Sequence, residues 1–163
     1  MPPSPRTRPG PVAPVRPVTA RWVVITSLVV CALGLLDAAY LTYEHYTASK
    51  TLACSDTGAI NCLKVTTSSY SKVAGVPVAL LGLIFFVVMT ALCLPALWRS
   101  TNTNLRRLRL AAVTVGILSV IYLVWVELFK VEAICLWCTG VHVLTFVLFA
   151  LVVVESTGAL TAE

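Results

Sequence analysis

The sequence contains few charged residues for its length. Aspartate, glutamate, lysine and arginine together make up 12% of the 163 residues, whereas 58% of the residues are hydrophobic. A typical soluble domain has about 25% charged residues. This shortage of charge, with a mean hydropathy of +0.91, excludes a soluble enzyme domain and indicates an integral membrane protein.

Proline is almost absent after residue 20, because seven of the nine prolines lie in the first 20 residues. Residues 1–20 also carry three arginines. Such a composition does not bury a core, so we expect a disordered cytoplasmic tail. The apolar run that follows lacks a small-x-small cleavage site and is too long for a typical signal peptide. It is therefore interpreted as the first membrane helix.

The apolar runs are long enough for four membrane helices. A transmembrane helix needs about 20 mainly apolar residues, and four stretches meet this requirement: residues 22–43, 77–97, 108–129 and 134–154. The predicted fold is an all-α, four-transmembrane-helix bundle that occupies residues 21–155 as one domain. Residues 44–76 form a loop after the first helix, and residues 156–163 form a second short tail.

The arginines occur in only two regions of the chain. Four precede or begin the first predicted helix and four surround the second connection: Arg6, Arg8, Arg16, Arg21, Arg99, Arg106, Arg107 and Arg109. The positive-inside rule places both regions, and hence both termini, in the cytoplasm. Residues 44–76 and 130–133 then lie outside, together with all four lysines. The net positive charge is thus explained by topology and not by nucleic-acid binding.

Four of the six cysteines fall on this outer face. Cys135 and Cys138 form a C-x-x-C pair in the first turn of the fourth helix, which we expect to start at about Ile134, and Cys54 and Cys62 lie in the outer loop. Residues three apart share one helix face, and a helix N-terminus stabilises a thiolate. Two cysteine pairs in an oxidising compartment permit electrons to enter at one pair and leave from the other.

The other two cysteines, Cys31 and Cys93, lie inside apolar stretches, and we interpret them as buried thiols without a partner. In the outer loop, a turn at Asp56 and Gly58 is expected to bring Cys54 and Cys62 within bonding range. The spacing of residues 65–73 predicts a short amphipathic helix after Cys62.

The prolines and one charged pair give further local predictions. Pro77 follows Gly75 and predicts the start of the second helix. Pro95 predicts a kink near the inner end of that helix. Glu127 and Lys130, about one turn apart, are predicted to pair.

An electron exit inside a membrane requires a lipid-soluble acceptor, for which a quinone beside Cys138 is the obvious class. His142, four residues beyond Cys138 on the same helix face, either bonds or protonates a quinone oxygen or is a buried histidine bonded to the backbone. Trp137 either stacks on the ring or anchors the helix. Asp37 either snorkels or accepts a hydrogen bond from a neighbouring helix, or handles a proton.

Four motifs occur in order along the chain: Cys54-x7-Cys62, Ser68, Gly75-Val76-Pro77-Val78-x-x-x-Gly82 and Cys135-x-x-Cys138. Together they resemble the vitamin K epoxide reductase family, especially its bacterial members. The similarity covers residues 33–147, which is nearly all of the predicted membrane domain.

The resemblance implies a four-helix bundle around a quinone of the menaquinone (vitamin K) or ubiquinone type, capped by the outer loop. Cys135 and Cys138 would be the active-site pair, with Cys138 nearest the quinone. Cys54 and Cys62 would be the shuttle pair, in which Cys54 exchanges with a partner protein and Cys62 forms a transient disulfide with Cys135. No resident metal is implied.

The resemblance also bears on the quinone site, for which the predicted residues are Cys138, His142, Val78, Trp137 and Ser68. Val78 stands where the animal enzymes carry an asparagine that bonds the quinone oxygen, and His142 stands where they carry a tyrosine. These two departures argue against epoxide reduction.

The leading hypothesis is a quinone-dependent thiol oxidoreductase of the bacterial cytoplasmic membrane. It would reoxidise a secreted thioredoxin-fold (DsbA-like) protein, expected to be a separate polypeptide because the chain ends soon after the fourth helix. The quinone-linked oxidases of the Dsb system carry their C-x-x-C in the first outer loop, so the cysteine order favours the first family. Two alternatives remain open: a non-enzymatic tetraspan adaptor with structural disulfides, and four thiolates around one zinc ion.

Overall fold

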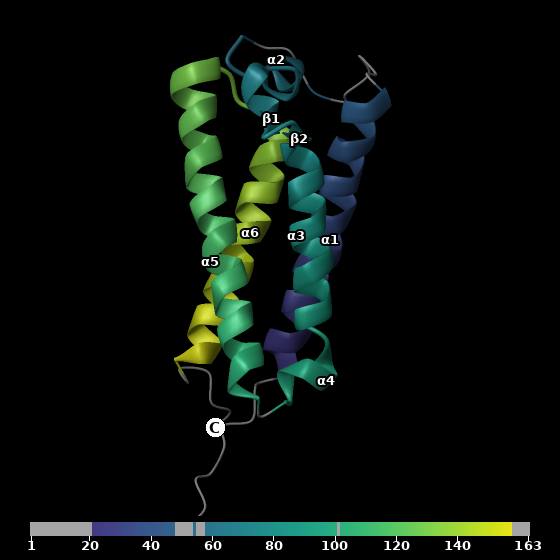
Figure 1. The fold of residues 1–163 in the computed structure, drawn as a ribbon, viewed down its shortest axis with the longest axis vertical. Helices are drawn as coiled ribbons and strands as arrows, with labels where there is room; N and C mark the ends of the chain where they lie inside the picture. Colours follow the sequence, from purple (N-terminus) through teal and green to yellow (C-terminus); the bar gives the residue numbers. More distant parts are fainter. Residues whose placement is uncertain (1–20, 48–53, 55–57, 101, 158–163) are drawn as a thin grey trace, which may run out of the picture.

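The computed structural model describes residues 21–47, 54, 58–100 and 102–157 (Figure 1). The predicted N-terminal tail, most of the predicted C-terminal tail and Asp56 lie outside the described residues. The elements in chain order are α1 (Arg21–Thr47), α2 (Cys62–Thr66), the 3-10 helix η1 (Ser69–Ser71), β1 (Lys72–Val73), β2 (Val76–Pro77), α3 (Val78–Leu92), α4 (Pro95–Trp98), α5 (Thr103–Val126), the π-helical turn η2 (Glu127–Val131) and α6 (Leu136–Ser156).

Among the described residues, three helices are long and apolar enough to cross a membrane: α1, α5 with its extension η2, and α6. The second predicted span is shorter, because α3 has 15 residues and is about 22 Å long at 1.5 Å per residue. The hydrocarbon core of a bilayer is about 30 Å thick. Helices α1, α3, α5 and α6 lie side by side in Figure 1, and each packs against two of the others.

The second predicted helix ends early because Pro95 has no backbone N–H to continue it. Helix α3 stops at Leu92 and α4 starts separately at Pro95, so a break replaces the predicted kink. Arg109 from α5 donates hydrogen bonds to the Leu92 carbonyl oxygen from Nε at 3.2 Å and from Nη2 at 2.8 Å. Its guanidinium also lies 3.7 Å from the centroid of the Trp98 ring. Arg109 therefore ties α5 to the break.

The core of the bundle is formed by apolar side chains from α1, α3, α5 and α6, with Trp98 from α4 at one end. Its buried members are Val23, Val30, Cys31, Ala38, Phe86, Met89, Leu92, Cys93, Trp98, Val113, Leu148 and Val152. Gly34 of α1 faces the Phe86 ring of α3 so closely that an added Cβ would overlap the ring. The absence of a side chain at Gly34 thus sets the approach of these two helices.

A short hairpin leads from the outer loop into α3. Val73 pairs with Val76 in it, and both turn residues, Ala74 at φ +50° and Gly75 at φ +83°, have the positive φ of a tight two-residue turn. Pro77 is the N-cap of α3, so this helix begins one residue later than predicted. The loop does contain a short helix, but the prediction placed it too late in the chain: α2 covers Cys62–Thr66, and the predicted region ends in η1 and β1. Figure 1 shows α2, β1 and β2 at one end of the bundle and α4 at the other.

Candidate redox centre

The C-x-x-C pair lies at the N-terminus of α6, but Cys135 stands just outside the helix. Helix α6 begins at Leu136 and Cys135 is its N-cap, so the prediction of a first-turn position is correct for Cys138 and wrong for Cys135. The Cys135 Sγ accepts a hydrogen bond from the backbone N–H of Cys138 at 3.2 Å. The sulfur thus occupies the place of the usual capping oxygen and faces the unpaired N–H groups of the first turn.

The surroundings of Cys135 favour its thiolate. The hydrogen bond with the Cys138 thiol lowers the pKa of Cys135, and the backbone N–H groups of Cys138 and Trp137 act in the same direction, whereas burial and Glu127 oppose them. Cys135 is 0% exposed. Because a thiolate is the nucleophile in thiol–disulfide exchange, this environment equips Cys135 to attack or to be exchanged.

Cys54 and Cys62 are joined as a disulfide, with their Cα atoms 6.0 Å apart. Their sulfurs are therefore within bonding range, as the sequence predicted, and Gly58 between them has a φ of +68° that suits a turn. Cys62 is the first residue of α2 and is 1% exposed, whereas Cys54 is half-buried. Cys135 and Cys138 are free thiols. The structure thus shows an oxidised loop pair and a reduced helix pair.

A two-bond backbone bridge joins the loop to the segment before α6. The Ile134 N–H donates to the Ala59 carbonyl at 2.9 Å, and the Asn61 N–H donates to the Ile134 carbonyl at 3.0 Å. Ile60 and Ile134 thereby form a parallel β-bridge. Cys62 follows Asn61 directly, and Cys135 follows Ile134 directly. The backbone segments that precede these two buried cysteines are therefore joined directly by hydrogen bonds.

Side chains reinforce this bridge. The Asn61 side chain accepts a hydrogen bond from the Lys64 backbone N–H at 2.8 Å and so caps α2. Val65 of α2 packs against a small buried cluster around the third connection, which consists of Val126, Val131 and Ala133. The loop helix is thus docked on the connection that precedes the C-x-x-C pair.

Glu127 is a buried carboxyl beside the dithiol, and it is only 6% exposed. The carboxyl accepts a hydrogen bond from the backbone N–H of Cys135, and its charge acts on Cys135 and Cys138. Its backbone carbonyl accepts a hydrogen bond from the Ala133 N–H at 3.2 Å. In place of the predicted ion pair with Glu127, Lys130 is exposed and its Nζ lies 5.2 Å from the centroid of the Trp125 ring.

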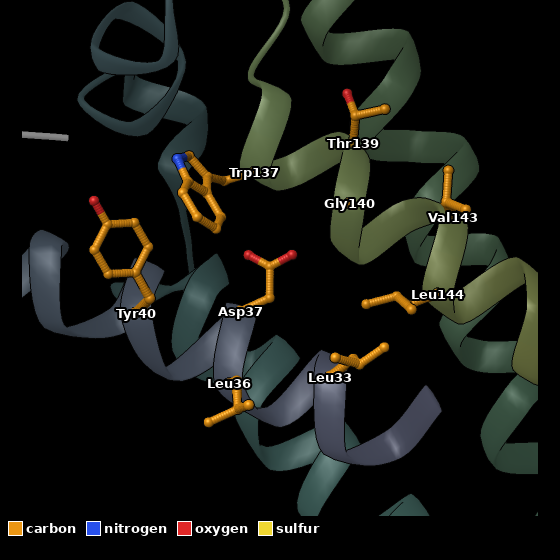
Figure 2. A pocket seen from close by; sticks show the side chains of 9 residues that line it. All are labelled: Leu33, Leu36, Asp37, Tyr40, Trp137, Thr139, Gly140, Val143 and Leu144. Carbon is orange, nitrogen blue, oxygen red and sulfur yellow. The ribbon is translucent and has the colours of Figure 1, made fainter. Parts of the chain in front are cut away.

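A groove of about 620 Å³ lies between α1 and α6, and its lining residues are Leu33, Leu36, Asp37, Tyr40, Trp137, Thr139, Gly140, Val143 and Leu144. Figure 2 shows the Asp37 carboxyl pointing into the space between the two helices, with Tyr40 and Trp137 beside it. The ring centroids of Tyr40 and Trp137 are 4.7 Å apart. The groove is therefore apolar and aromatic around a single carboxyl.

One oxygen of Asp37 distinguishes this groove from an ordinary apolar surface. Asp37 Oδ1 is buried and accepts no hydrogen bond from the residues that the structure describes, so the predicted bond from a neighbouring helix is not made at that oxygen. On α6, an added Cβ at Gly140 would lie 2.7 Å from Asp37 Oδ2. Gly140 therefore leaves the room that the carboxyl occupies.

The structure distributes the predicted quinone residues over several elements. Trp137 lines the groove. Cys138 and His142 lie one turn apart on α6, and His142 is 7% exposed. Val78 is the half-buried first residue of α3, and the Ser68 hydroxyl donates a local hydrogen bond to the Val65 carbonyl at 2.8 Å. Their roles toward a quinone stay predictions.

Cys31 and Cys93 lie against each other and not apart. Both are 0% exposed, which confirms the interpretation as buried thiols. Their side chains are hydrogen-bonded to each other between α1 and the end of α3, so the prediction that they lack a partner is wrong. A sequence pattern does not reveal this pairing because the two residues come from different helices.

Reasoning from the sequence missed the position of Glu127. The i, i+3 spacing to Lys130 led to a surface ion pair, whereas the side chain turns inward at the π-helical turn. A signal was present, because Glu127 is the only acidic residue in the third apolar run. An ionisable residue inside such a run is a candidate functional residue by default.

The described residues define a class: a predominantly helical membrane protein that carries a disulfide and a free dithiol at one end of its bundle. Comparison with protein families refines this class. The chain belongs to the vitamin K epoxide reductase family, whose family model matches residues 25–153. No curated protein gave a significant match. Because this is a family of membrane oxidoreductases, the protein is a membrane thiol oxidoreductase.

Proposed function

We propose that the protein oxidises the dithiol of a separate thioredoxin-fold protein outside the membrane and passes the electrons to a membrane quinone. The observation that carries this proposal is the backbone bridge between residues 59–61 and Ile134. It keeps the backbone segments that carry Cys62 and Cys135 next to each other, which supports direct exchange between these two residues.

The proposed electron path has two disulfide exchanges. The partner dithiol reduces the Cys54–Cys62 disulfide by attack at the half-buried Cys54, and the partner becomes a disulfide. Cys62 then attacks Cys135 of the oxidised helix pair, which releases Cys138 as a thiolate. Attack of Cys54 on Cys62 restores the loop disulfide and leaves Cys135 and Cys138 reduced. Two electrons and two protons move in each full transfer, and no other reductant is required.

The groove between α1 and α6 has the chemistry to hold a quinone. Trp137 and Tyr40 offer an aromatic wall, and the unpartnered Asp37 Oδ1 can accept a hydrogen bond from a hydroxyl of the reduced ring or, when the carboxyl is protonated, donate one to a quinone oxygen. The charge of Asp37 also acts on Cys138. When bound, a quinone supplies a lipid-soluble acceptor of two electrons and two protons.

We further propose that the redox end of the bundle faces the outside of a bacterial cytoplasmic membrane. The exposed arginines at the start of α1 and α5 lie at the opposite end from α2 and the cysteine pairs (Figure 1). The positive-inside rule supports this orientation, and an outer compartment permits disulfides to persist.

The direct test is reduction of quinone by the purified full-length protein in the presence of a reduced thioredoxin-fold protein. Cys138→Ala removes the thiol from which the electrons pass to the quinone, so we expect quinone reduction to fall to background. Cys93→Ala, at the opposite end of the bundle, is the control and should retain activity. Quinone reduction that persists in Cys138→Ala would refute the proposed path.

A non-enzymatic adaptor is the second candidate, because the Cys54–Cys62 disulfide by itself also suits a structural staple. A trapping experiment separates the two. In the Cys54→Ser/Cys138→Ser variant, the relay predicts that Cys62 and Cys135 form a disulfide on mild oxidation. If these two thiols do not join, the loop pair is a staple and the adaptor is favoured.

A further inference from the structure

Glu127 is a buried carboxyl that the electron path does not use. Removing a carboxylate from water costs several kcal/mol unless it is paired or protonated. Glu127 is 6% exposed, and its contact with the Cys135 backbone N–H is an interaction that an ordinary amide or hydroxyl side chain would provide as well. A neutral side chain would be enough for this structural contact. The burial of a carboxyl at Glu127 therefore points to a role in the reaction of the dithiol.

The fold places this carboxyl against the backbone of the dithiol. Glu127 is the first residue of the π-helical turn η2, and its backbone carbonyl closes the connection to Ala133. Its carboxyl reaches the N–H of Cys135, the residue whose sulfur caps α6. Turns of the π type often occur at functional sites because they redirect a side chain.

The other charged groups near the pair leave Glu127 as the carboxyl on the Cys135 side. Asp37 of α1 acts on Cys138. Lys64, on the α2 helix that packs against η2, is exposed, as is Lys130, whose Nζ lies over Trp125. Among the described residues, Glu127 is the carboxyl whose charge acts on Cys135.

We infer that Glu127 is the proton acceptor for the Cys135 thiol when Cys135 and Cys138 close to a disulfide. The Sγ–H bond of Cys135 breaks and an Sγ–Sγ bond forms, while two electrons leave through Cys138 to a two-electron acceptor. The Cys135 proton passes to the Glu127 carboxylate, and the Cys138 proton leaves with the electrons. In the opposite step, reduction by the loop pair, the protonated Glu127 returns its proton to Cys135.

This inference rests on the proposed function for the identity of the acceptor, but its test needs neither quinone nor partner. The full chain carrying Cys31→Ala, Cys54→Ser, Cys62→Ser and Cys93→Ala, in which Cys135 and Cys138 are the remaining thiols, is reduced and then oxidised with diamide. The rate of Cys135–Cys138 disulfide formation is followed from acid to alkaline pH. If this pair forms no disulfide even with Glu127 in place, the proposed function fails as well.

Glu127→Gln keeps the size of the side chain and an oxygen for the Cys135 N–H but does not accept a proton. We expect closure at neutral pH to slow by about 100-fold, the scale of one general base. The deficit should disappear at alkaline pH, above the pKa of Cys135, where Cys135 loses its proton unaided. Glu132→Gln, an exposed glutamate on the same connection, is the matched control and should leave the rate unchanged.

Two results would overturn the inference. A deficit of equal size at every pH shows that Glu127 only holds the connection in place, and faster closure in Glu127→Gln shows that its charge only opposes the thiolate. If Glu127→Gln does not fold, the same measurement is made on Glu127→Asp, which keeps a carboxylate as the proton acceptor. It should retain the pH dependence of the unsubstituted pair at a reduced rate, and a loss of that pH dependence refutes the role.

Discussion

A sulfur in the capping position of a helix links structure to reactivity at Cys135. Capping residues usually carry an oxygen, which satisfies a free N–H and does nothing else. Here the capping atom is also the candidate nucleophile, so the same bonds that begin α6 stabilise the thiolate. Its partner thiol, Cys138, contributes the largest part of the lowered pKa of Cys135.

This arrangement predicts a shift in reactivity when Cys138 loses its thiol. Cys138→Ala removes the side-chain donor and retains the backbone N–H, so the pKa of Cys135 should rise. The thiolate fraction of Cys135 then grows only at higher pH, and its alkylation is slower at neutral pH but unchanged at strongly alkaline pH. The measurement is the pH profile of iodoacetamide labelling of the Cys135 peptide by mass spectrometry, with Cys93→Ala as control. An unshifted profile contradicts the assignment.

At the scale of elements, two kinds of contact position the centre: close helix packing and a backbone bridge. The α1–α3 contact depends on the missing side chain at Gly34, which admits the Phe86 ring. The loop depends on hydrogen bonds of Asn61 and Ile134, which require no particular side chain at the bridge itself.

Gly34→Ala should destabilise the bundle by about 1–3 kcal/mol, because its Cβ forces Phe86 out of place. Gly82→Ala on α3 is a matched control, since its nearest neighbour would be the Ala38 Cβ at 4.0 Å and alanine favours a helix over glycine by about 1 kcal/mol. Thermal midpoints in detergent should fall for Gly34→Ala and hold or rise for Gly82→Ala. Phe86→Leu combined with Gly34→Ala should recover part of the loss. Equal midpoints for both alanine variants would show that the close approach is unimportant.

Two substitutions at Asn61 separate the helix cap from the bridge. Asn61→Ala loses the cap on Lys64, worth about 1 kcal/mol, but keeps the N–H that donates to Ile134. Asn61→Pro removes that N–H and conflicts with the φ of −150° at this position. In the Cys54→Ser/Cys138→Ser variant, Cys62–Cys135 disulfide formation should slow about tenfold more for proline than for alanine, which matches the loss of one hydrogen bond. The same rate for both would remove the bridge from the exchange mechanism.

On the scale of the whole molecule, the exposed arginines are separated from the redox centre along the helix axes, whereas the exposed lysines Lys64, Lys72 and Lys130 belong to the redox end. Arg21, Arg99, Arg106 and Arg107 are exposed at one end, and the cysteine pairs lie at the other (Figure 1). This separation gives the bundle two chemically different ends.

A sidedness measurement tests the orientation. Ser69→Cys, next to the cysteine end, and Ser100→Cys, at the arginine end, are both exposed positions. On intact cells a membrane-impermeant maleimide should label Ser69→Cys, and it should label Ser100→Cys only after permeabilisation. The reverse pattern would place the redox centre in the cytoplasm.

The parts of this architecture that the sequence predicts are those set by local composition. The length of the apolar runs predicted α1, α5 and α6. The spacing of the motifs identified the two cysteine pairs and indicated the family. The break at Leu92 was predicted only as a kink, because the Arg109 side chain that makes a full break tolerable comes from another helix. The inward turn of Glu127 and the contact of Cys31 with Cys93 escaped prediction for the same reason, since both depend on packing between distant segments.

The bridge at Ile134 also determines where the chain tolerates insertions. Cys62 directly follows Asn61 and Cys135 directly follows Ile134, so an added residue after Asn61 or after Ile134 would move a cysteine away from its present place beside the bridge. The one-residue offsets of Cys62 from Asn61 and of Cys135 from Ile134 are therefore fixed by the bridge.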